Sequence, residues 1–434
     1  MERRFRLRLD QLLADCTIPD DALTGLAQRL EDFARPFLES LPSPESRDHG
    51  HTYLAGLLSD VARKNTESIA YRHGKDRQVL QRFLGYTPWD HAPLLDELTR
   101  QVAAEIGEAD GVIVFDPSAF AKKGTESVGV QRQWCGRLGK TENCQVGIYM
   151  GYVTRQEQVL VDERLYLPKE WTRQRLTKCG VPEEVTQQTR HELALEMLKD
   201  RGAKLPHGWV AGDDEMGRVT WFRQELQVRG ERYLLAVPSN TTVRDLEEAV
   251  PPQVVTGPGR GERKGPRKAS FVSVAEWCAS QPANAWTRIE VRAADKGPIV
   301  VEALKRRVEA KENRRVTGRE ELLFVTRQAL AGGGWKYDYH LSNAPAETAL
   351  SELARVANAE HRIEQCLQRG KSEAGMADYQ TRSWWGWHHH QTLSMMAVWF
   401  LVRETRRGKK GNPRFDAAAG PRSVVDDPAP GQRL

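Results

Sequence analysis

Hydrophobic residues in the first quarter of the chain recur at spacings of three and four, which is the pattern of one apolar face on an α-helix. Residues 54–69 show this spacing, and residues 77–86 repeat it. Pro88 interrupts the pattern because proline lacks the amide hydrogen that a helix interior requires, and a further amphipathic helix is predicted after Pro93. Residues 1–108 are therefore predicted to be helical.

The pattern changes at residue 111, where short apolar runs typical of β-strands replace the helical spacing. The first run ends at Asp116, and residues 121–144 are predicted to form a long polar loop. The next elements are predicted to be two strands, a helix and a strand that ends in acids, at residues 143–154, 158–168, 189–206 and 209–218. This order is typical of an α/β layer, in which acids at strand ends lie at the sheet edge that binds ligands.

Residues 220–345 break this order and are predicted to form a β-rich insertion, because separate strand-like runs alternate with loops rich in glycine and proline. Helical spacing returns at residues 349–375 and again from about Trp387 to Arg403. From Gly408 onward Gly, Pro, Arg and Asp dominate, which predicts a disordered tail. The boundaries that follow from these changes are 1–108, 109–219, 220–345, 346–407 and 408–434.

The composition limits the class of protein. Of the 434 residues, 39% are hydrophobic and 28% are charged, which allows sizeable cores and excludes a compositionally disordered chain. No apolar run approaches the ~18 residues that a membrane helix needs, and no apolar block follows the N-terminal arginines, so neither a membrane span nor a secretory signal is expected. The six cysteines include no CxxC pair, which disfavours a disulfide framework and a structural zinc site. We expect a cytoplasmic protein.

The net charge of +5 is modest, but Lys and Arg are concentrated in two segments rich in Gly and Pro. Arg260, Arg263 and Lys264 belong to the first, residues 254–270, and the second covers residues 402–414. Such segments suit phosphate contacts, because Lys and Arg neutralise the charge of a nucleic-acid backbone and release counterions. A solvated loop and a frayed tail are equally compatible with them, and the basic faces of the N-terminal helices allow the same two interpretations.

Three acids stand out by position. Asp116 closes the first strand, Asp213 closes a later strand with Asp214 beside it, and Glu364 lies on the first of the two C-terminal helices. Carboxylate oxygens are ligands for Mg²⁺, and two such ions about 4 Å apart can activate a nucleophile and stabilise a leaving oxygen in phosphodiester chemistry. Taken singly, each acid is more often a turn former, a helix cap or a solvent-exposed residue.

Three segments around these acids favour a catalytic role over these structural roles. Residues 115–149 hold the first acid, then Lys-Lys-Gly and a Gly-Val-x-Arg-Gln segment. Residues 209–218 hold an acid four positions before glycine, and residues 361–397 hold an acid followed seven positions later by lysine. In these segments the chain resembles the DDE transposases of bacterial insertion sequences, specifically the insertion sequence 701 group. The resemblance extends from about Tyr53 to Lys410.

The resemblance implies a site in which Asp116, Asp213 and Glu364 are both the catalytic residues and the ligands of two Mg²⁺ ions, for which Mn²⁺ is expected to substitute. The spacing to glycine favours Asp213 and leaves Asp214 as the alternative. Related families place arginine where this chain has Glu360, and often an aromatic residue where it has Met216. The DNA-binding residues are expected to be Lys122, Lys123, Arg132, Arg260, Arg263, Lys264, Lys371 and Arg382.

The resemblance also implies an architecture and a function. Residues 109–219 and 346–407 would form an RNase H-like α/β core, with the catalytic glutamate on a helix of the second part. Residues 1–108 would form an all-helical DNA-binding domain, and residues 220–345 the β-rich insertion. The implied activity is strand cleavage at transposon ends and strand transfer by the freed 3′-hydroxyl into target DNA. A homodimer assembled on double-stranded DNA and association with the nucleoid are implied as well.

Two other functions remain open. One is a domesticated, sequence-specific DNA-binding protein that retains the transposase fold but does not cut. The other is an RNase H-like nuclease acting on RNA–DNA hybrids, which would share the metal site but has no evident use for the helical region and the insertion. Inverted repeats flanking the gene would favour a mobile element over the domesticated protein. Competition between hybrid and duplex DNA would separate the nuclease from the transposase.

Two clusters near the C-terminus invite a functional interpretation. His388, His389 and His390 are consecutive, and consecutive helical residues point in different directions, so the three cannot chelate one metal together. Packing or phosphate contact is the expected role. Aromatic residues nearby are suited to stacking on bases, although packing in the core is the favoured interpretation. They are Tyr379, Trp384, Trp385 and Trp387.

Overall fold

The computed structural model describes residues 24–248, 269–292, 299–312, 315–330 and 332–411. The basic residues Arg260, Arg263 and Lys264 and the greater part of the predicted tail lie outside these ranges. Within the described ranges, no helix combines the length and the apolar character that crossing a membrane would require.

The described part of the N-terminal region is helical, as predicted. Its helices are α3 (Leu26–Leu38), α4 (Pro44–Leu57), α5 (Thr66–Arg72), α6 (Arg77–Gly85) and α7 (Ala92–Ile106). Three of them begin at a side-chain cap, in which Ser43, Asn65 or Asp76 accepts a hydrogen bond from a backbone amide of the first turn. Such caps satisfy amide groups that have no partner inside the helix, and so they fix where each helix starts.

The strands join into one sheet. They are β1 (Val112–Ala121), β2 (Gln131–Cys135), β3 (Lys140–Val153), β4 (Gln158–Leu165), β5 (Trp209–Gly212), β6 (Tyr233–Ala236), β7 (Thr242–Asp245), β8 (Val272–Ser273), β9 (Thr287–Arg292), β10 (Ile299–Glu312), β11 (Arg315–Ala329) and β12 (Trp335–Ser342). Their order is β2-β3-β1-β5-β6-β12-β11-β10-β7-β8, with β4 also paired to β3 and β9 to β10. β1 runs antiparallel to β3 and parallel to β5, and β5 runs parallel to β6. The fold is a mixed α/β structure with a large sheet.

Helices lie between the strands along the chain and at its end. They are α8 (Arg173–Lys178), α9 (Arg190–Asp200), α10 (Asp214–Gly217), α11 (Thr220–Val228), α12 (Val274–Ala279), α13 (Leu350–Glu373) and α14 (Trp384–Gly411), with 3₁₀ turns η1 (Gly136–Leu138), η2 (Gly202–Lys204) and η3 (Ala283–Ala285). The predicted helices at the C-terminus are confirmed. Helix α14 continues to Gly411, three residues past the predicted start of the tail.

Two other predictions are wrong. The first strand does not end at Asp116, because β1 continues to Ala121 and Asp116 is paired with Tyr149 of β3. The segment predicted as a long polar loop is a loop only at residues 122–130; the rest forms β2, a 3₁₀ turn and the start of β3, and the two strands pair antiparallel from Gln131↔Cys144 to Cys135↔Lys140. The side chains of β2 alternate between exposed and half-buried, with Arg132 and Trp134 exposed. Because this strand lies at the edge of the sheet, most of its side chains face water, and its sequence lacks the apolar alternation that reveals a strand.

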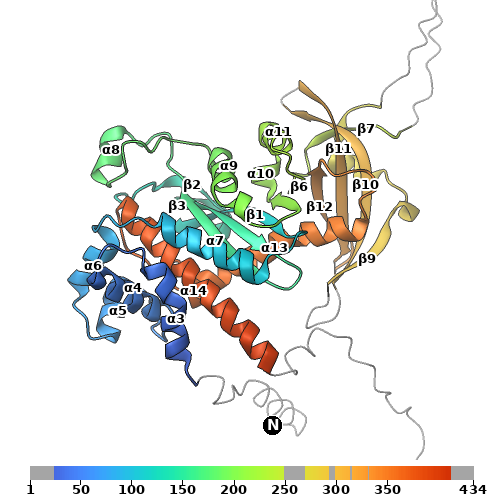
Figure 1. Cartoon of the computed structure of the whole chain (residues 1–434). Coiled ribbons are helices and arrows are strands. Elements are labelled where there is room, and N and C mark those ends of the chain that lie inside the picture. Colours follow the sequence, from blue (N-terminus) through green and yellow to red (C-terminus); the bar gives the residue numbers. More distant parts are fainter. Residues whose placement is uncertain (1–23, 249–268, 293–298, 313–314, 331, 412–434) are drawn as a thin grey trace, which may run out of the picture.

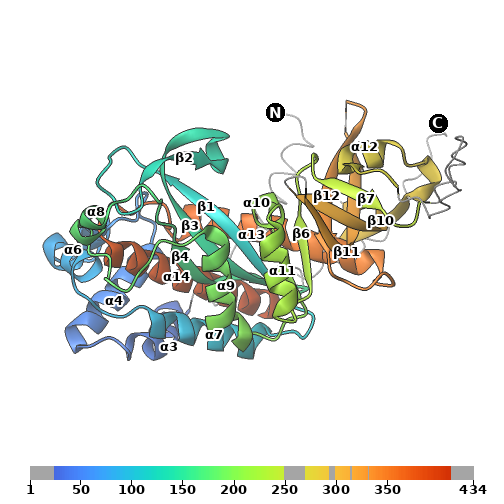
Figure 2. The same cartoon turned by 90° about the horizontal axis from the view of Figure 1, so that it is seen from above.

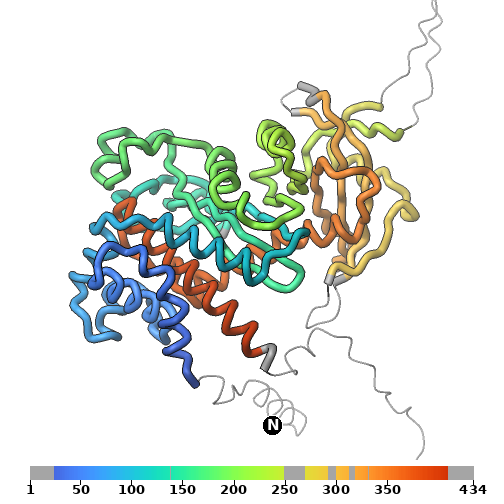
Figure 3. Tube along the Cα trace, in the orientation of Figure 1, coloured from blue at the N-terminus to red at the C-terminus, as the bar shows by residue number. Residues whose placement is uncertain are grey.

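Two clusters of buried apolar residues hold the molecule together. The larger cluster has members from Phe33 to Val402, and the N-terminal helices, strands β1 to β6 and helices α13 and α14 contribute to it. The smaller cluster lies within β7 and β10–β12, with Trp277 of α12. Figures 1 and 2 show helices α3–α6 and the β-rich part at opposite ends of the molecule, with β1 and β3 between them. In Figure 3, α13 leads from the β-rich part back to the central strands, and α14 then continues past the N-terminal helices.

Candidate active site

Two of the three predicted acids lie side by side at one edge of the sheet. Parallel pairing of β1 with β5 aligns Phe115 with Gly212, so Asp116 and Asp213 each follow the last paired residue of neighbouring strands. Both side chains are half-buried. The order of the strands thus brings together two carboxyl groups that are 97 positions apart in the sequence.

Local structure separates Asp213 from its neighbour Asp214. Asp213 is the N-cap of α10, where one carboxylate oxygen accepts the amide hydrogen of Met216 at 3.0 Å. The Asp214 side chain is 51% exposed and forms an ion pair with Arg218 at 2.8 Å. Among acids near Asp116, Asp213 has the largest effect on its pKa, and Asp214 is not among the causes of that shift. This arrangement supports Asp213 as the second acid.

Helix α13 brings the third acid to the same edge. It packs against β1, β3 and β5, and close approach to β3 depends on Gly151, because a Cβ there would collide with the Ile363 side chain. From this helix Lys371 donates a hydrogen bond to the Ser118 hydroxyl of β1 at 2.7 Å. Glu364 lies two turns earlier on the same helix, at 62% side-chain exposure, with His361 at 3.5 Å.

The charges at this edge act on one another. Burial raises the pKa of Asp116 well above its ordinary value, and the negative charges of Asp213 and Glu364 raise it further, whereas Lys371 lowers it. Burial also raises the pKa of Asp213, to about 7. The effect of Asp213 and Glu364 on Asp116 agrees with the pairing of β1 with β5 and with the packing of α13 on β1.

The structure adds a fourth carboxyl group, which the sequence did not identify as part of the site. Burial raises the pKa of Glu360 well above its ordinary value, followed by the charges of Asp213, Asp116 and Glu364. In the sequence, Glu360 was notable only because related families have arginine at this position. Its position four residues before Glu364, which places both on one helix face, was the available signal.

These carboxyl groups fit a hard divalent cation. Mg²⁺ binds through oxygen atoms of a few carboxylates and retains water or phosphate oxygens in its other positions. Half-buried acids whose pKa values are raised chiefly by burial, and for Asp116 also by neighbouring acids, are a donor set whose negative charge such an ion would compensate. Asp116, Asp213 and Glu364 are the residues that would hold it, with Glu360 beside them.

The predicted DNA-binding residues fall into several places. Lys122, Lys123 and Arg382 line one surface cavity of about 430 Å³ together with Arg63. The Lys122 ammonium lies 3.3 Å from the centre of the Tyr379 ring, and burial lowers its pKa to about 7. Lys123 and Arg382 are exposed. The other predicted contacts within the described ranges, exposed Arg132 on β2 and Lys371 beside Ser118, do not line this cavity.

Other basic residues have structural partners. Arg362 lies two residues after Glu360, the position at which related families have arginine. It is buried and donates hydrogen bonds to Gln158 and to the carbonyl of Thr154. On the N-terminal helices, Lys75 and Arg77 form ion pairs with acids at 2.7 and 2.8 Å. The basic character of those helices is therefore partly compensated within the molecule.

The C-terminal histidine and aromatic clusters are structural, as the favoured interpretations predicted. The three histidines are buried and bond in three directions: His388 to Glu163, His389 to the carbonyls of Leu84 and Trp89, and His390 to Tyr53 and the Gly375 carbonyl. The nearby aromatic residues pack in the core rather than presenting free faces for bases. Their exposures are 3% for Tyr379, 9% for Trp384 and 0% for Trp387, and Trp385 is half-buried against the same core.

The amino-acid sequence matches a known protein family. The family model described as "DDE superfamily endonuclease" matches residues 36–298, a span that includes Asp116 and Asp213 and ends before Glu364. The chain belongs to the DDE superfamily of endonucleases. The family match agrees with the carboxylate pair at the edge of the sheet.

One similar protein is a probable transposase, and one similar solved structure is of a transposase. A probable transposase for insertion sequence element IS701 from Microchaete diplosiphon is 33% identical over 120 residues, which make up 27% of this chain and 32% of that protein. The predicted relationship to the insertion sequence 701 group is thereby confirmed. The cryo-EM structure of a piggyBac transposase synaptic complex with hairpin DNA matches with a TM-score of 0.40 and 8% identity, over 86% of this chain and 68% of that one.

Asp213 gives this DDE endonuclease a pH-dependent stability. Its pKa is raised from 3.8 to about 7, chiefly by burial, so the folded protein retains a proton that the unfolded chain has already lost. The resulting contribution to stability is complete below the unfolded pKa and is lost as the pH rises through about 7. Asp213→Asn is therefore expected to raise the Tm of the metal-free protein by about 1–3 °C at pH 8 and by little at pH 5.

Calorimetry of the two proteins at both pH values measures this difference. Asp214→Asn is the matched control, because Asp214 is exposed and paired with Arg218, and it is expected to give no stabilisation at pH 8. An equal shift of Tm at pH 5 and pH 8 for Asp213→Asn would contradict the assignment.

Gly217 lets α10 approach β6 closely enough to position Asp213. A Cβ at this residue would collide with the backbone carbonyl of Ala236. Gly217→Ala is therefore expected to lower the free energy of unfolding by about 1–3 kcal/mol and, by displacing Asp213, to slow DNA cleavage by about 100-fold. Urea denaturation and a cleavage assay measure the two effects, with Gly124→Ala as control, since a Cβ there meets no atom within 4 Å. Unchanged cleavage would show that α10 does not position a catalytic group.

Proposed function

We propose that this protein is a DNA transposase that cuts strands at the ends of its element and joins the freed 3′-hydroxyl to target DNA. The observation that carries the proposal is the placement of Asp116 and Asp213 directly after the last paired residues of two adjacent parallel strands, with Glu364 near enough to raise the pKa of Asp116. Membership of the DDE endonuclease superfamily and the similarity to a probable transposase support it.

The proposed architecture assigns the chemistry to an RNase H-like core. Strands β1 and β3–β6 with α13 and α14 form an α/β layer, and they fall mainly within residues 109–219 and 346–407. Residues 1–108 are proposed to bind DNA as a helical domain, and residues 220–345 to form the β-rich insertion. A separate buried cluster within β7 and β10–β12 supports the view that the insertion packs around its own core.

Divalent metal is the proposed cofactor, as two Mg²⁺ ions held by Asp116, Asp213 and Glu364. Bound there, the ions would activate the attacking oxygen and stabilise the leaving oxygen of a phosphodiester. The surrounding backbone orients the carboxyl groups, because the cap on α10 fixes Asp213 and the pairing of β1 with β3 and β5 fixes Asp116. Each group must release its proton before it can act as a ligand.

The basic side chains near the site hold the DNA backbone in this proposal. Lys371 sits two helical turns from Glu364 and within reach of β1, where it can neutralise a phosphate next to the cleaved bond. Lys122, Lys123 and Arg382 surround a cavity of about 430 Å³ that would take a neighbouring segment of the strand. Double-stranded transposon ends and target DNA are the proposed substrates, bound by a homodimer.

Strand transfer is the step that distinguishes a transposase from a simple nuclease. A labelled duplex that carries the gene's flanking sequence, already cut to expose its 3′-hydroxyl, is incubated with the protein, Mg²⁺ or Mn²⁺ and a supercoiled plasmid. We expect label joined to the plasmid, and no joining when the end is 3′-deoxy. Cleavage without joining, or preferential cutting of an RNA–DNA hybrid competitor, would favour a nuclease.

The cavity residues are expected to contribute ordinary electrostatic contacts. Lys123→Ala and Arg382→Ala should each weaken DNA binding to all sequences alike and reduce the slope of log K against log salt by about 0.9. Binding titrations at several salt concentrations measure the slope. Lys75→Ala is the control, because Lys75 already pairs with Asp48 at 2.7 Å and lies outside the cavity. A slope unchanged by both cavity substitutions would remove this surface from the DNA path.

A further inference from the structure

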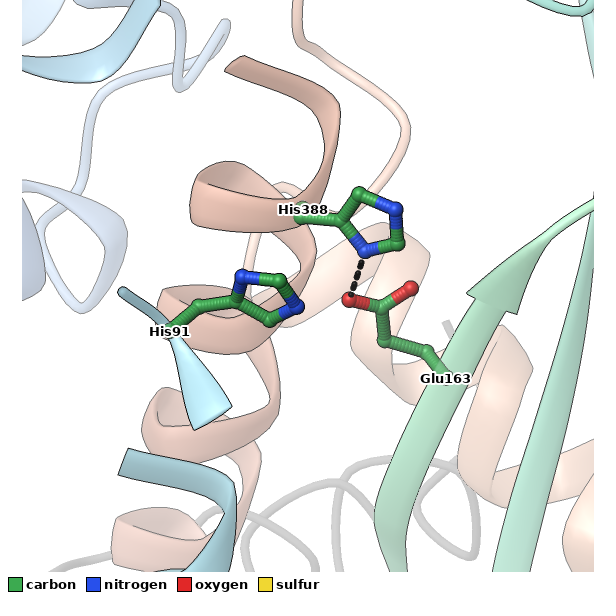
Figure 4. Close-up of side chains that lie close together, drawn as sticks. All are labelled: His91, Glu163 and His388. Carbon is green, nitrogen blue, oxygen red and sulfur yellow. Dashed lines mark hydrogen bonds and ion pairs between the residues drawn. The ribbon is translucent and has the colours of Figure 1, made fainter. Parts of the chain in front are cut away.

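His91, Glu163 and His388 meet from three separate elements. His91 precedes α7, Glu163 lies on β4 and His388 lies in the first turns of α14. Each offers one atom able to bind a metal, and these atoms lie within 4.8 Å of one another. Figure 4 shows the three side chains converging, with Nδ1 of His388 bonded to a Glu163 oxygen at 2.8 Å and the His91 ring beside both.

The cluster is distinct from the candidate active site. Tyr149 of β3 pairs with Asp116 on one side and with Glu163 on the other, so Glu163 is two strands, or about 10 Å, from Asp116. The Glu163 and His388 side chains are almost completely buried, at 0% and 2% exposure. Because neither side chain is accessible to solvent, neither residue can take part in DNA cleavage.

Each of the three residues has an atom without a partner. Among the described residues, none provides a hydrogen-bond partner for Oε2 of Glu163, Nε2 of His388 or Nδ1 of His91, and all three atoms are buried. A buried polar atom that forms no bond costs about 1–3 kcal/mol, so the hydrogen-bonding capacity of these three side chains is not fully satisfied.

Neighbouring cations do not supply partners for these atoms. Arg164 and Arg201 are the nearest guanidinium groups, and both bind the other carboxylate of the strand, Asp162, at 2.6 and 3.1 Å. Glu163 forms a hydrogen bond with His388, and His91 lies beside both residues.

We propose that His91, Glu163 and His388 bind one zinc ion that fastens α7 and α14 to the central sheet. Two imidazoles and a carboxylate are a donor set for zinc in proteins, at about 2.0–2.2 Å from the metal, whereas Mg²⁺ prefers oxygen alone. Ligands of one tetrahedral ion lie roughly 3.4 Å apart, so atoms already within 4.8 Å need only small side-chain movements.

Zinc content of the purified full-length protein tests this site. The protein is incubated with zinc and then passed through a desalting column in buffer containing excess Mg²⁺, which keeps the active-site acids filled. About one zinc per chain is expected in the wild type and in Asp116→Asn, and less than about 0.2 in His91→Ala and His388→Gln. His91→Ala is expected to fold, because His91 makes no capping hydrogen bond with its side chain.

A second measurement does not depend on retention of the metal. Zinc is expected to raise the Tm of the wild type and of Asp116→Asn but not that of His91→Ala, because an ion that binds the folded state alone stabilises it. Less than about 0.2 zinc in the wild type, or equal zinc and an equal Tm response in His91→Ala, would overturn the proposal. Either result would leave Glu163 and His388 as a simple buried ion pair.

Discussion

Asp116→Asn and Asp213→Asn are each expected to reduce DNA cleavage by at least about 1,000-fold while leaving binding to the flanking DNA within about twofold. Each substitution keeps the shape of the side chain and removes the charge that would hold a divalent cation. The loss corresponds to several kcal/mol of transition-state stabilisation. DNA binding should persist because the basic residues that would contact the backbone lie elsewhere, around the cavity lined by Lys122, Lys123 and Arg382.

Asp214→Asn is the matched control for this experiment. It removes the same charge one residue away, but from a side chain that is exposed and paired with Arg218. Cleavage by Asp214→Asn is expected to remain within about threefold of the wild type. Rapid cleavage by Asp213→Asn together with its loss in Asp214→Asn would move the second acid to position 214.

The two acids of α13 are expected to differ strongly when each is changed to glutamine. Glu364→Gln should abolish cleavage to the same extent as the aspartate substitutions, because it removes the third ligand. Glu360→Gln should reduce cleavage by no more than about tenfold, since Glu360 is not one of the three proposed metal ligands and glutamine has nearly the same shape.

Cleavage assays at a fixed Mg²⁺ concentration compare these two variants directly. Their positions four residues apart on one helix make them close controls for each other, because folding and DNA binding should change little in either. The opposite outcome, with Glu360→Gln inactive and Glu364→Gln active, would identify Glu360 as the third acid. It would also mean that the exposed Glu364 faces DNA rather than metal.

Much of the site could be predicted from local patterns. Apolar runs that end in acids predicted β1 and β5, and parallel pairing of neighbouring strands is sufficient to bring Asp116 and Asp213 together. The same logic predicted the helix that carries Glu364, because apolar residues recur at helical spacing along α13. These features depend on interactions over a few residues, and a single sequence records such interactions directly.

The remaining features depend on contacts that no local pattern contains. The strand β2 was missed because its sequence, Gln-Arg-Gln-Trp-Cys, has no alternation of apolar and polar residues, and only pairing with β3 makes it a strand. The burial of Glu360 follows from the packing of α13 on the sheet, which no spacing rule predicts. The meeting of Glu163 with His388 joins residues that are 225 positions apart.

Metal-dependent cutting at the ends of the element is the most direct test of the proposed function. A plasmid that carries the gene's own flanking DNA is incubated with wild-type protein in Mg²⁺, Mn²⁺ or EDTA, beside Asp116→Ala and Glu364→Ala. We expect cutting at the flanks in Mg²⁺ and Mn²⁺, none in EDTA and none by either variant. Cutting that persists in EDTA or in both variants would contradict a carboxylate-held metal site. Specific binding to the flanks without any cutting would contradict the transposase and favour a DNA-binding protein.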